Sequence, residues 1–278
     1  MFIILLTQVF AYYFLTPTLK LYNLVEPEFL LLLASSFLVA AAGYIINDYM
    51  DVMLDLVNKP EKVIVGKTFS RRWAMFLHLT FSLAAILMAV KINKKVALMV
   101  LIASLCLWIY SQFLKRTYLI GNILVASLTA FTLWIIYVYN PDVTGAGIWV
   151  YGIFAFATTL LREIIKDTED LRGDQKFKCK TLPIVLGVRK TKQVLIWIQS
   201  ILLVSGLIFC GSFNSLSESG NKIYVLFIIY MLLFVILPMC FMIWLLRKAD
   251  VKKDFSKLSF YSKLIMLSGI LSMVFWRF

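Results

Sequence analysis

Asn47–Asp55 (NDYMDVMLD) and Asp167–Asp174 (DTEDLRGD) are two acidic runs that stand at the ends of otherwise apolar segments. In each run, steps of three and then four residues place three carboxylates on one face of a helix. These carboxylates are Asp48, Asp51 and Asp55 in the first run and Asp167, Asp170 and Asp174 in the second. Like charges stacked in this way repel one another, so the pattern predicts a bound cation. Clustered carboxylate oxygens suit Mg²⁺ held between the protein and a phosphate-bearing substrate.

The composition is that of an integral membrane protein. Hydrophobic residues make up 62% of the chain and charged residues 15%, and the mean hydropathy is +0.88. Soluble domains are about 45–50% apolar and about 25% charged. The sequence therefore predicts an all-α membrane protein with about nine helices, each long enough to cross a hydrocarbon core of about 30 Å. The apolar windows are 1–22, 27–48, 73–92, 95–113, 117–139, 145–166, 192–211, 223–246 and 257–276.

The net charge of +13 is explained by topology, with no need for nucleic acid as a partner. If the loop over 49–72 is cytoplasmic, 22 of the 28 basic residues fall on that side of the membrane. The positive-inside rule then predicts nine crossings in the cell (inner) membrane, with a cytoplasmic N-terminus and an external C-terminus. Both acidic runs would face the cytoplasm, so the active site is expected there.

The chain is expected to form one polytopic membrane domain over residues 1–278. The longest polar stretch, about 162–192, is too short to bury a core of its own. The first apolar segment has no basic leader and no small-residue cleavage site, so we expect a mature helix there. The four cysteines form no C-x-x-C pair, which argues against a zinc site or a disulfide framework.

Basic residues follow each acidic run closely, and a third basic segment, Tyr110–Arg116, joins two apolar windows on the same side. A diphosphate carries several negative charges. A site for it needs metal ions bridged by carboxylates on one side and Lys or Arg on the other. The sequence contains both components. Positive-inside topology alone explains any single one of these basic residues equally well.

Together these motifs resemble those of the UbiA superfamily of intramembrane prenyltransferases. The resemblance covers about residues 40–190. It is carried by the two acidic runs, Asn58-Lys59-Pro60, Gly66, Tyr110-Ser111, Leu114-Lys115-Arg116 and Gly121-Asn122. It implies nine helices around a central cavity, with the acidic motifs at the cytoplasmic face. The partners implied are the bilayer, a prenyl diphosphate donor and a lipid-soluble acceptor.

The resemblance also implies roles for residues. Two groups would hold Mg²⁺, the cofactor, on the diphosphate: Asn47, Asp48, Asp51 and Asp55, and then Asp167, Asp170 and Asp174. Within them, the residues expected to be catalytic are Asp51, Asp55, Asp170 and Asp174. The residues expected to bind substrates are Lys62, Lys67, Arg71, Tyr110, Lys115, Arg116, Arg162, Lys166 and Lys180.

Within the superfamily, residues 161–174 and 180–187 look most like enzymes that prenylate geranylgeranylglyceryl phosphate and so form an ether lipid. An aromatic quinone precursor, of the 4-hydroxybenzoate or dihydroxynaphthoate type, is an alternative acceptor. From another class, an ion-coupled transporter would place its carboxylates near the middle of helices. A CDP-alcohol phosphotransferase would need an Asp-Gly-x-x-Ala-Arg run, which this chain lacks.

Overall fold

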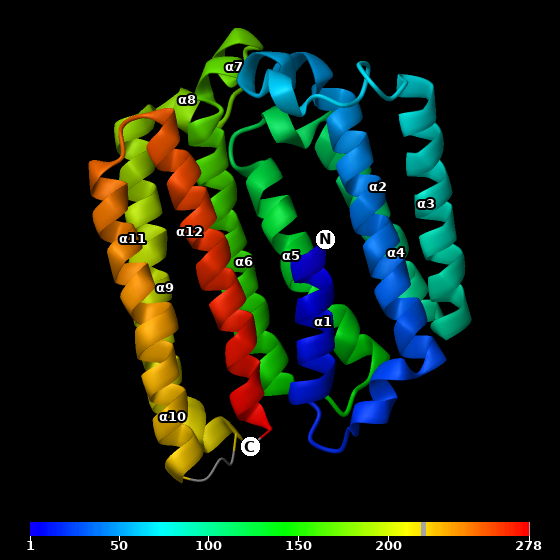
Figure 1. Ribbon diagram of the computed structural model, residues 1–278, viewed down its shortest axis with the longest axis vertical. Coiled ribbons are helices and arrows are strands. Elements are labelled where there is room, and N and C mark those ends of the chain that lie inside the picture. Colours follow the sequence, from blue (N-terminus) through cyan, green and yellow to red (C-terminus); the bar gives the residue numbers. More distant parts are fainter. Residues whose placement is uncertain (218–220, 278) are drawn as a thin grey trace.

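The structure, a computed structural model, describes residues 1–217 and 221–277, and the side chain of Lys62 lies outside the described part. Long helices run side by side along the longest axis, and short helices cap one end (Figure 1). Within the described ranges, eight helices are long and apolar enough to cross a membrane. The prediction of an all-α membrane protein is confirmed.

The long helices follow the apolar windows of the sequence. Their bounds are α1 Phe2–Phe14, α2 Pro27–Asn58, α3 Arg71–Ile92, α4 Lys94–Gln112, α5 Ile120–Tyr139, α6 Gly145–Glu169, α9 Val188–Ser217, α10 Asn221–Met231, α11 Leu237–Lys248 and α12 Lys252–Leu271. A π-helical turn, Leu232–Ile236, joins α10 to α11. The short elements are α7 Leu171–Lys176, α8 Leu182–Leu186 and the 3₁₀ turns Leu21–Val25, Pro60–Lys62, Leu114–Arg116 and Ser272–Trp276.

The first helix is shorter than the window over 1–22 predicts, so eight helices rather than nine reach membrane-spanning length in the described chain. Helix α1 has 13 residues and is about 20 Å long at 1.5 Å per residue. Pro17 follows its end, and proline cannot continue a helix because it lacks the backbone N–H. The N-terminus lies about midway along the bundle, and α1 runs from there away from the capped end (Figure 1).

The acidic runs differ in backbone. The first lies wholly within α2, which continues ten residues beyond its apolar window to Asn58. The second is broken: α6 ends at Glu169, Asp170 has non-helical dihedrals (φ −95°, ψ 11°), and α7 begins at Leu171. The prediction of a single helical face is therefore right for the first run and wrong for the second. The break turns Asp174 onto a separate short helix.

Six helices surround a central cavity. Residues of α1, α2, α4, α5, α6 and α12 line it, while α3 packs outside α2 and α4, and α9 and α11 pack outside α6 and α12. Aromatic stacking closes the bundle at the end opposite α7, where Tyr12 lies on Phe29 with ring centres 4.1 Å apart and Tyr139 lies 5.6 Å from Tyr12. The cavity is thus held between the acidic cap and this aromatic layer.

Candidate active site

The central cavity has a volume of about 750 Å³. Its upper end, next to α7, is lined by charged residues, and its lower part is apolar. Five carboxylates from both acidic runs line its upper end: Asp51, Asp55, Asp167, Asp170 and Asp174. Asn47, Tyr110, Lys115, Arg116, Arg162, Glu163 and Lys166 line it as well. The two runs, more than a hundred positions apart in the sequence, therefore open onto one space.

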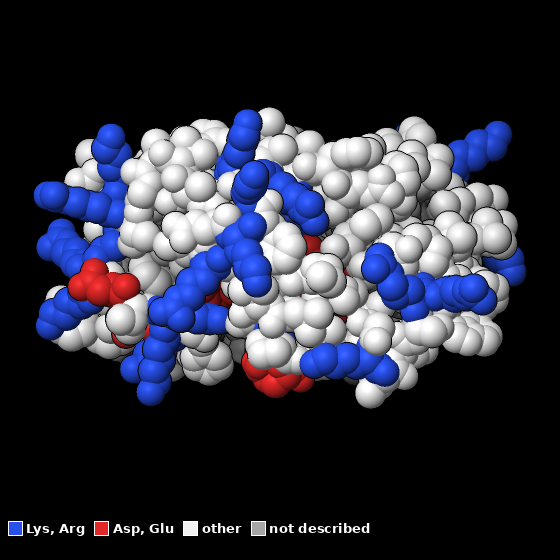
Figure 2. All heavy atoms as spheres, turned by 90° about the horizontal axis from the view of Figure 1, so that it is seen from above, with Lys and Arg blue, Asp and Glu red and all other residues white. Residues whose placement is uncertain are grey.

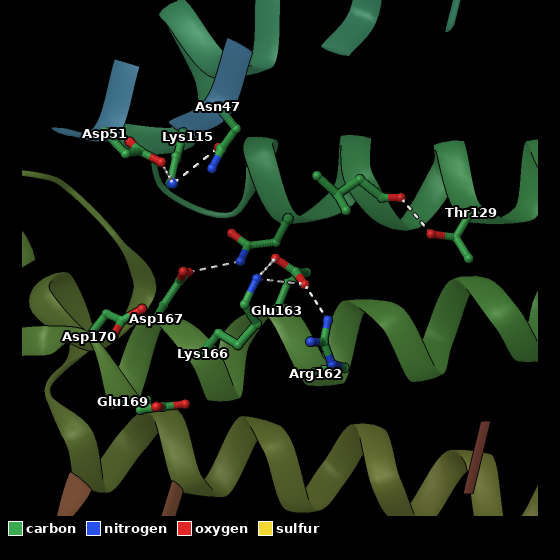
Figure 3. A network of polar contacts seen from close by, with 12 residues as sticks. Asn47, Asp51, Lys115, Thr129, Arg162, Glu163, Lys166, Asp167, Glu169 and Asp170 are labelled. Carbon is green, nitrogen blue, oxygen red and sulfur yellow. Dashed lines mark hydrogen bonds and ion pairs between the residues drawn. The ribbon is translucent and has the colours of Figure 1, made fainter. Parts of the chain in front are cut away.

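On the α2 side, Asp51 is buried, with 2% of its surface exposed, and forms an ion pair with the Lys115 ammonium. The same ammonium donates to Asn47 Oδ1 at 3.1 Å, so Lys115 points into the first acidic run (Figure 3). Burial alone would lower the pKa of Lys115, but the Asp51 carboxylate raises it above its ordinary value. Lys115 is therefore a charged ammonium that neutralises Asp51.

The turn that carries Lys115 depends on a close backbone approach. A Cβ at Gly121 would lie 2.6 Å from the Leu114 carbonyl oxygen, so only glycine fits there. Leu119 precedes it in the left-handed region, with φ 57°. The tight turn brings Lys115 back over α2, because the loop after α4 folds against the start of α5.

On the α6 side, Asn122 of α5 donates its amide to Asp167 Oδ2 at 2.8 Å. One helical turn earlier, the buried Glu163 carboxylate accepts from Arg162 Nη1 at 3.0 Å and from Lys166 Nζ at 3.1 Å (Figure 3). This triad carries two positive charges and one negative charge on the cavity wall. Arg162 Nε is buried and has no hydrogen-bond partner within the described part of the chain.

Lys59 and Thr181 hold the two carboxylates at the break between α6 and α7. Lys59 Nζ lies 2.8 Å from Asp170 Oδ2, and no described side chain or backbone group partners the buried Asp170 Oδ1. Burial would lower the pKa of Lys59, but its hydrogen bond and charge attraction to Asp170 raise it. Asp174 accepts from Thr181 Oγ1 at 3.2 Å, and burial raises the pKa of Asp174 to about 6.

Asn58 and Gly173 fasten the ends of the two runs together. The Gly173 backbone N–H donates to Asn58 Oδ1 at 2.9 Å, and a Cβ at Gly173 would collide with the Asn58 side chain. Lys252 Nζ donates to the Asn58 carbonyl oxygen at 2.7 Å. A helix end, a glycine and a lysine of α12 thus fix where the two runs meet.

The structure does not bring every predicted residue to the cavity. Asp48 is exposed and does not line it. Lys67 donates to the Pro60 carbonyl oxygen at 2.7 Å, and the Arg71 guanidinium lies over the Tyr49 ring at 4.4 Å. Lys180 is exposed, although its backbone N–H donates to the Arg116 carbonyl oxygen at 2.9 Å. These residues shape the loops around the cavity mouth.

Lys115 and Lys59 also occupy places where metal ions would be expected. Among the described residues, no three His, Cys, Asp or Glu side chains stand close enough to hold a metal ion by themselves. Two of the carboxylates are instead paired with lysines. Asp170 Oδ1, which has no partner among the described residues, is an oxygen atom that could coordinate a metal ion. Mg²⁺ keeps few protein ligands and takes the others from water and substrate phosphate. The donor set therefore fits Mg²⁺ that arrives with a phosphate.

Three residues without a predicted role contact or line the same space: Asn122, Glu163 and Thr181. Asn122 stood in one of the motifs, next to Gly121, and Glu163 was visible as an acid flanked by Arg162 and Lys166. The partners of Glu163 are its sequence neighbours on α6, whereas Asn122 and its partner Asp167 lie on different helices. The carboxylates of α2 lie in its last turns at the capped end, not near the middle of the helix, which disfavours an ion relay through the bilayer.

The capped end is strongly basic around this acidic centre. Figure 2 looks down on it and shows Lys and Arg spread over the whole face, while Asp and Glu are visible at a few places only. Basic residues around a mouth raise the local concentration of an anionic substrate. The face is therefore suited to attract a diphosphate towards the carboxylates below.

Comparison with known proteins agrees with these observations. The sequence profile of the UbiA prenyltransferase family matches residues 4–264. A digeranylgeranylglyceryl phosphate synthase of Saccharolobus solfataricus is 30% identical over 241 residues, which cover 84% of this chain and 79% of that protein.

Two solved structures share the fold. One, from a study of digeranylgeranylglyceryl phosphate synthase in membranes, has a TM-score of 0.69 and 23% identity and covers 98% of this chain and 93% of its own. The other is a UbiA homologue of Archaeoglobus fulgidus bound to DMAPP and Mg²⁺. It has a TM-score of 0.62 and 16% identity and covers 97% of this chain and 94% of its own.

Proposed function

This chain belongs to the UbiA prenyltransferase family, and from that premise we propose that it transfers a geranylgeranyl group from its diphosphate to the glycerol hydroxyl of geranylgeranylglyceryl phosphate, with Mg²⁺ as cofactor. One observation carries the proposal. Carboxylates of two distant acidic runs, together with Lys115, form the upper end of a cavity whose lower part is apolar. That combination suits a molecule with an anionic head and a hydrocarbon tail.

The diphosphate head would lie among Asp51, Asp55, Asp170 and Asp174. Lys115 and Lys59 are within reach, because each already contacts a carboxylate of this group. As an anionic head enters, both ammonium groups exchange a carboxylate for phosphate oxygens, and the released carboxylates become available to a cation. Hydrogen bonds between ionised partners are about twice as strong as neutral ones, so the exchange keeps every charge paired.

Mg²⁺ would be held by oxygens of the diphosphate together with two groups of side chains: Asp51 and Asp55, with Asn47 beside them, and Asp167, Asp170 and Asp174. When bound, it neutralises charge on the leaving diphosphate. The A. fulgidus homologue binds DMAPP and Mg²⁺ together, which supports this assignment. Asp167 lines the same end of the cavity, and Asn122 sets its orientation by donating to Oδ2.

Transfer requires the allylic carbon–oxygen bond of the donor to break as a new bond to the acceptor oxygen forms. The departing diphosphate keeps the electron pair of the broken bond and would take up the proton that the acceptor hydroxyl loses. Lys115 and Lys59 stabilise its growing charge. The allylic carbon gains positive character, which the faces of aromatic rings favour. Tyr110 lines the acidic end of the cavity, and Phe131 lines it further along α5. The apolar wall keeps water from capturing that carbon.

The acceptor phosphate would lie against Arg162 and Lys166. These two cations share one counter-ion, Glu163, so the triad retains a positive charge that faces the cavity. A phosphate bound there would place the glycerol beside the donor head, because Asp167 lies one residue after Lys166. The Saccharolobus relative is named as a synthase of digeranylgeranylglyceryl phosphate. That name supports geranylgeranylglyceryl phosphate over an aromatic ring as the acceptor.

The proposal is tested with purified protein in nanodiscs, labelled geranylgeranyl diphosphate and a panel of acceptors. The panel holds geranylgeranylglyceryl phosphate, 4-hydroxybenzoate and dihydroxynaphthoate. We expect an acid-stable ether lipid from the first acceptor only, and loss of transfer in Asp51→Asn and Asp170→Asn. Asp250→Asn is the matched control, since Asp250 pairs with Lys192 outside the cavity. Full transfer by both site variants would exclude the proposed site. A prenylated aromatic ring as the product would show that the acceptor is a quinone precursor and not geranylgeranylglyceryl phosphate.

A further inference from the structure

Gln8 lies at the lower limit of the cavity and is fully buried. Its Nε2 donates to Ser36 Oγ of α2 at 2.9 Å and to the Thr132 carbonyl oxygen of α5 at 3.3 Å. The side chain therefore bridges three helices across the cavity. A polar group at this depth is costly in a membrane protein unless it has a function, and here its Oε1 is buried with no partner among the described residues.

Little of the cavity continues below Gln8, and Ile135, three residues beyond Thr132, is the last residue of α5 that lines it. No residue further along α1 lines the cavity, and no residue of α2 nearer its start than Ser36 does. One turn below lie Ala11 and Tyr12, which are buried, and the stacked rings of Tyr12 and Phe29 fill the space beneath. Close-packed side chains of this kind resist insertion of further carbon atoms. Gln8 and this aromatic layer thus form a floor.

The depth of this floor corresponds to one particular chain length. Ser36 and Asp51 are 15 positions apart on α2, which is about 22 Å along a helix that rises 1.5 Å per residue. An extended geranylgeranyl chain of sixteen main-chain carbons spans roughly 20 Å, at about 1.25 Å per carbon for bonds of about 1.5 Å. The end of a chain one isoprene unit shorter would stop about 5 Å above the floor, which is about one helical turn. The end of a chain one unit longer would collide with the floor.

We propose that Gln8 is the floor of the donor tunnel and selects a twenty-carbon prenyl diphosphate. The inference rests on the proposed function, because it assumes that the diphosphate head lies at Asp51. It adds a specificity-determining residue far from the reacting atoms. The bulk of Gln8, held across the cavity by Ser36 and Thr132, determines how deep the tail of the donor reaches.

The test compares donors of fifteen, twenty and twenty-five carbons by kcat/KM with one acceptor. We expect Gln8→Ala to raise about tenfold the ratio of kcat/KM for the twenty-five-carbon donor to kcat/KM for the twenty-carbon donor. Gln8→Phe and Ser36→Phe add bulk at the same level from two helices, and both should shift preference to fifteen carbons. Gln8→Met has similar size and should keep the wild-type preference. Thr7→Ala is the control on the same helix, because Thr7 does not line this cavity.

Wild-type ratios in Gln8→Ala and in both phenylalanine variants would overturn the proposal. So would a Gln8→Met variant that relaxes the ratio as far as Gln8→Ala, because size would then not be the determinant. The rise in Tm that each diphosphate causes with Mg²⁺, measured without acceptor, reports the length preference of donor binding independently of transfer. If donors bind with the expected length preference but no acceptor is prenylated, the proposed function fails and the floor stands.

Discussion

The Lys115 ammonium is paired with the Asp51 carboxylate, although 64 positions separate the two residues. One residue comes from the loop after α4 and the other from the last turns of α2. A buried carboxylate without a partner would be costly, so the pair stabilises the site while no anion is bound. The same lysine lines the end of the cavity that the diphosphate would take. Lys115 would therefore pair first with Asp51 and then, once the donor binds, with its diphosphate.

Replacing Lys115 should affect the reaction more than the fold. We expect Lys115→Met to lower kcat/KM for the donor by about 10²–10³-fold, the usual cost of losing one charged donor to a developing negative charge. Lys115→Arg keeps the charge and should retain more activity. Steady-state kinetics with varied donor give the answer. A Lys115→Met variant within threefold of wild type would remove Lys115 from the mechanism.

Removing the amide that orients Asp167 should weaken metal binding. In Asn122→Leu the Asp167 carboxylate loses its hydrogen bond of 2.8 Å. Loss of a partner that orients a metal ligand costs about 10–100-fold in affinity. We therefore expect a rise of that size in the Mg²⁺ concentration that gives half-maximal activity, with an unchanged maximum. An unchanged Mg²⁺ requirement would show that Asp167 does not contact the metal.

The acceptor subsite predicts a selective kinetic effect. Lys166→Met should raise KM for geranylgeranylglyceryl phosphate at least tenfold, because the acceptor phosphate loses one of its two cations. The KM for the donor should stay within twofold. Initial rates measured with each substrate varied in turn separate the two effects. If KM rises for the donor instead, Lys166 belongs to the diphosphate site.

The contact between Asn58 and Gly173 predicts a loss of stability. Gly173→Ala forces a Cβ into the Asn58 side chain, and overpacking of this kind costs about 1–3 kcal/mol. We expect a lower Tm together with lower activity, because Asp170 and Asp174 flank the glycine. Gly211→Ala is the control, since no described atom lies within 4 Å of a Cβ there. Equal Tm values for the two variants would contradict the packing argument.

Metal binding should weaken as the pH falls through about 6. Burial raises the pKa of Asp174 to about 6, so the carboxylate is ionised at neutral pH and takes up a proton below that value. A protonated carboxyl group is a poor ligand, and the affinity for Mg²⁺ then falls about tenfold per pH unit. Thermal stabilisation by Mg²⁺ with donor, followed from pH 7.5 to 5, measures this effect. Asp174→Asn should bind more weakly throughout and lose the step near pH 6 that the wild type shows.

Local sequence signals predicted the helices well, and they failed where the backbone breaks. Apolar windows located eight spanning helices, because hydropathy is a property of each segment by itself. The window over 1–22 was too long, since Pro17 ends the helix early. The second acidic run was read as one helix, yet the chain turns at Asp170. That turn is stabilised by Asn58, which lies far away in the sequence.

The sequence by itself determined that this chain is helical, lies in a membrane and carries two acidic runs beside basic loops. Those properties follow from composition and spacing, which act over a few residues. Only the tertiary structure decided that Lys115 pairs with Asp51, that Lys59 pairs with Asp170 across 111 positions, and that Gln8 spans the bottom of the cavity. Each depends on how helices pack against one another, and packing joins residues that no local pattern connects.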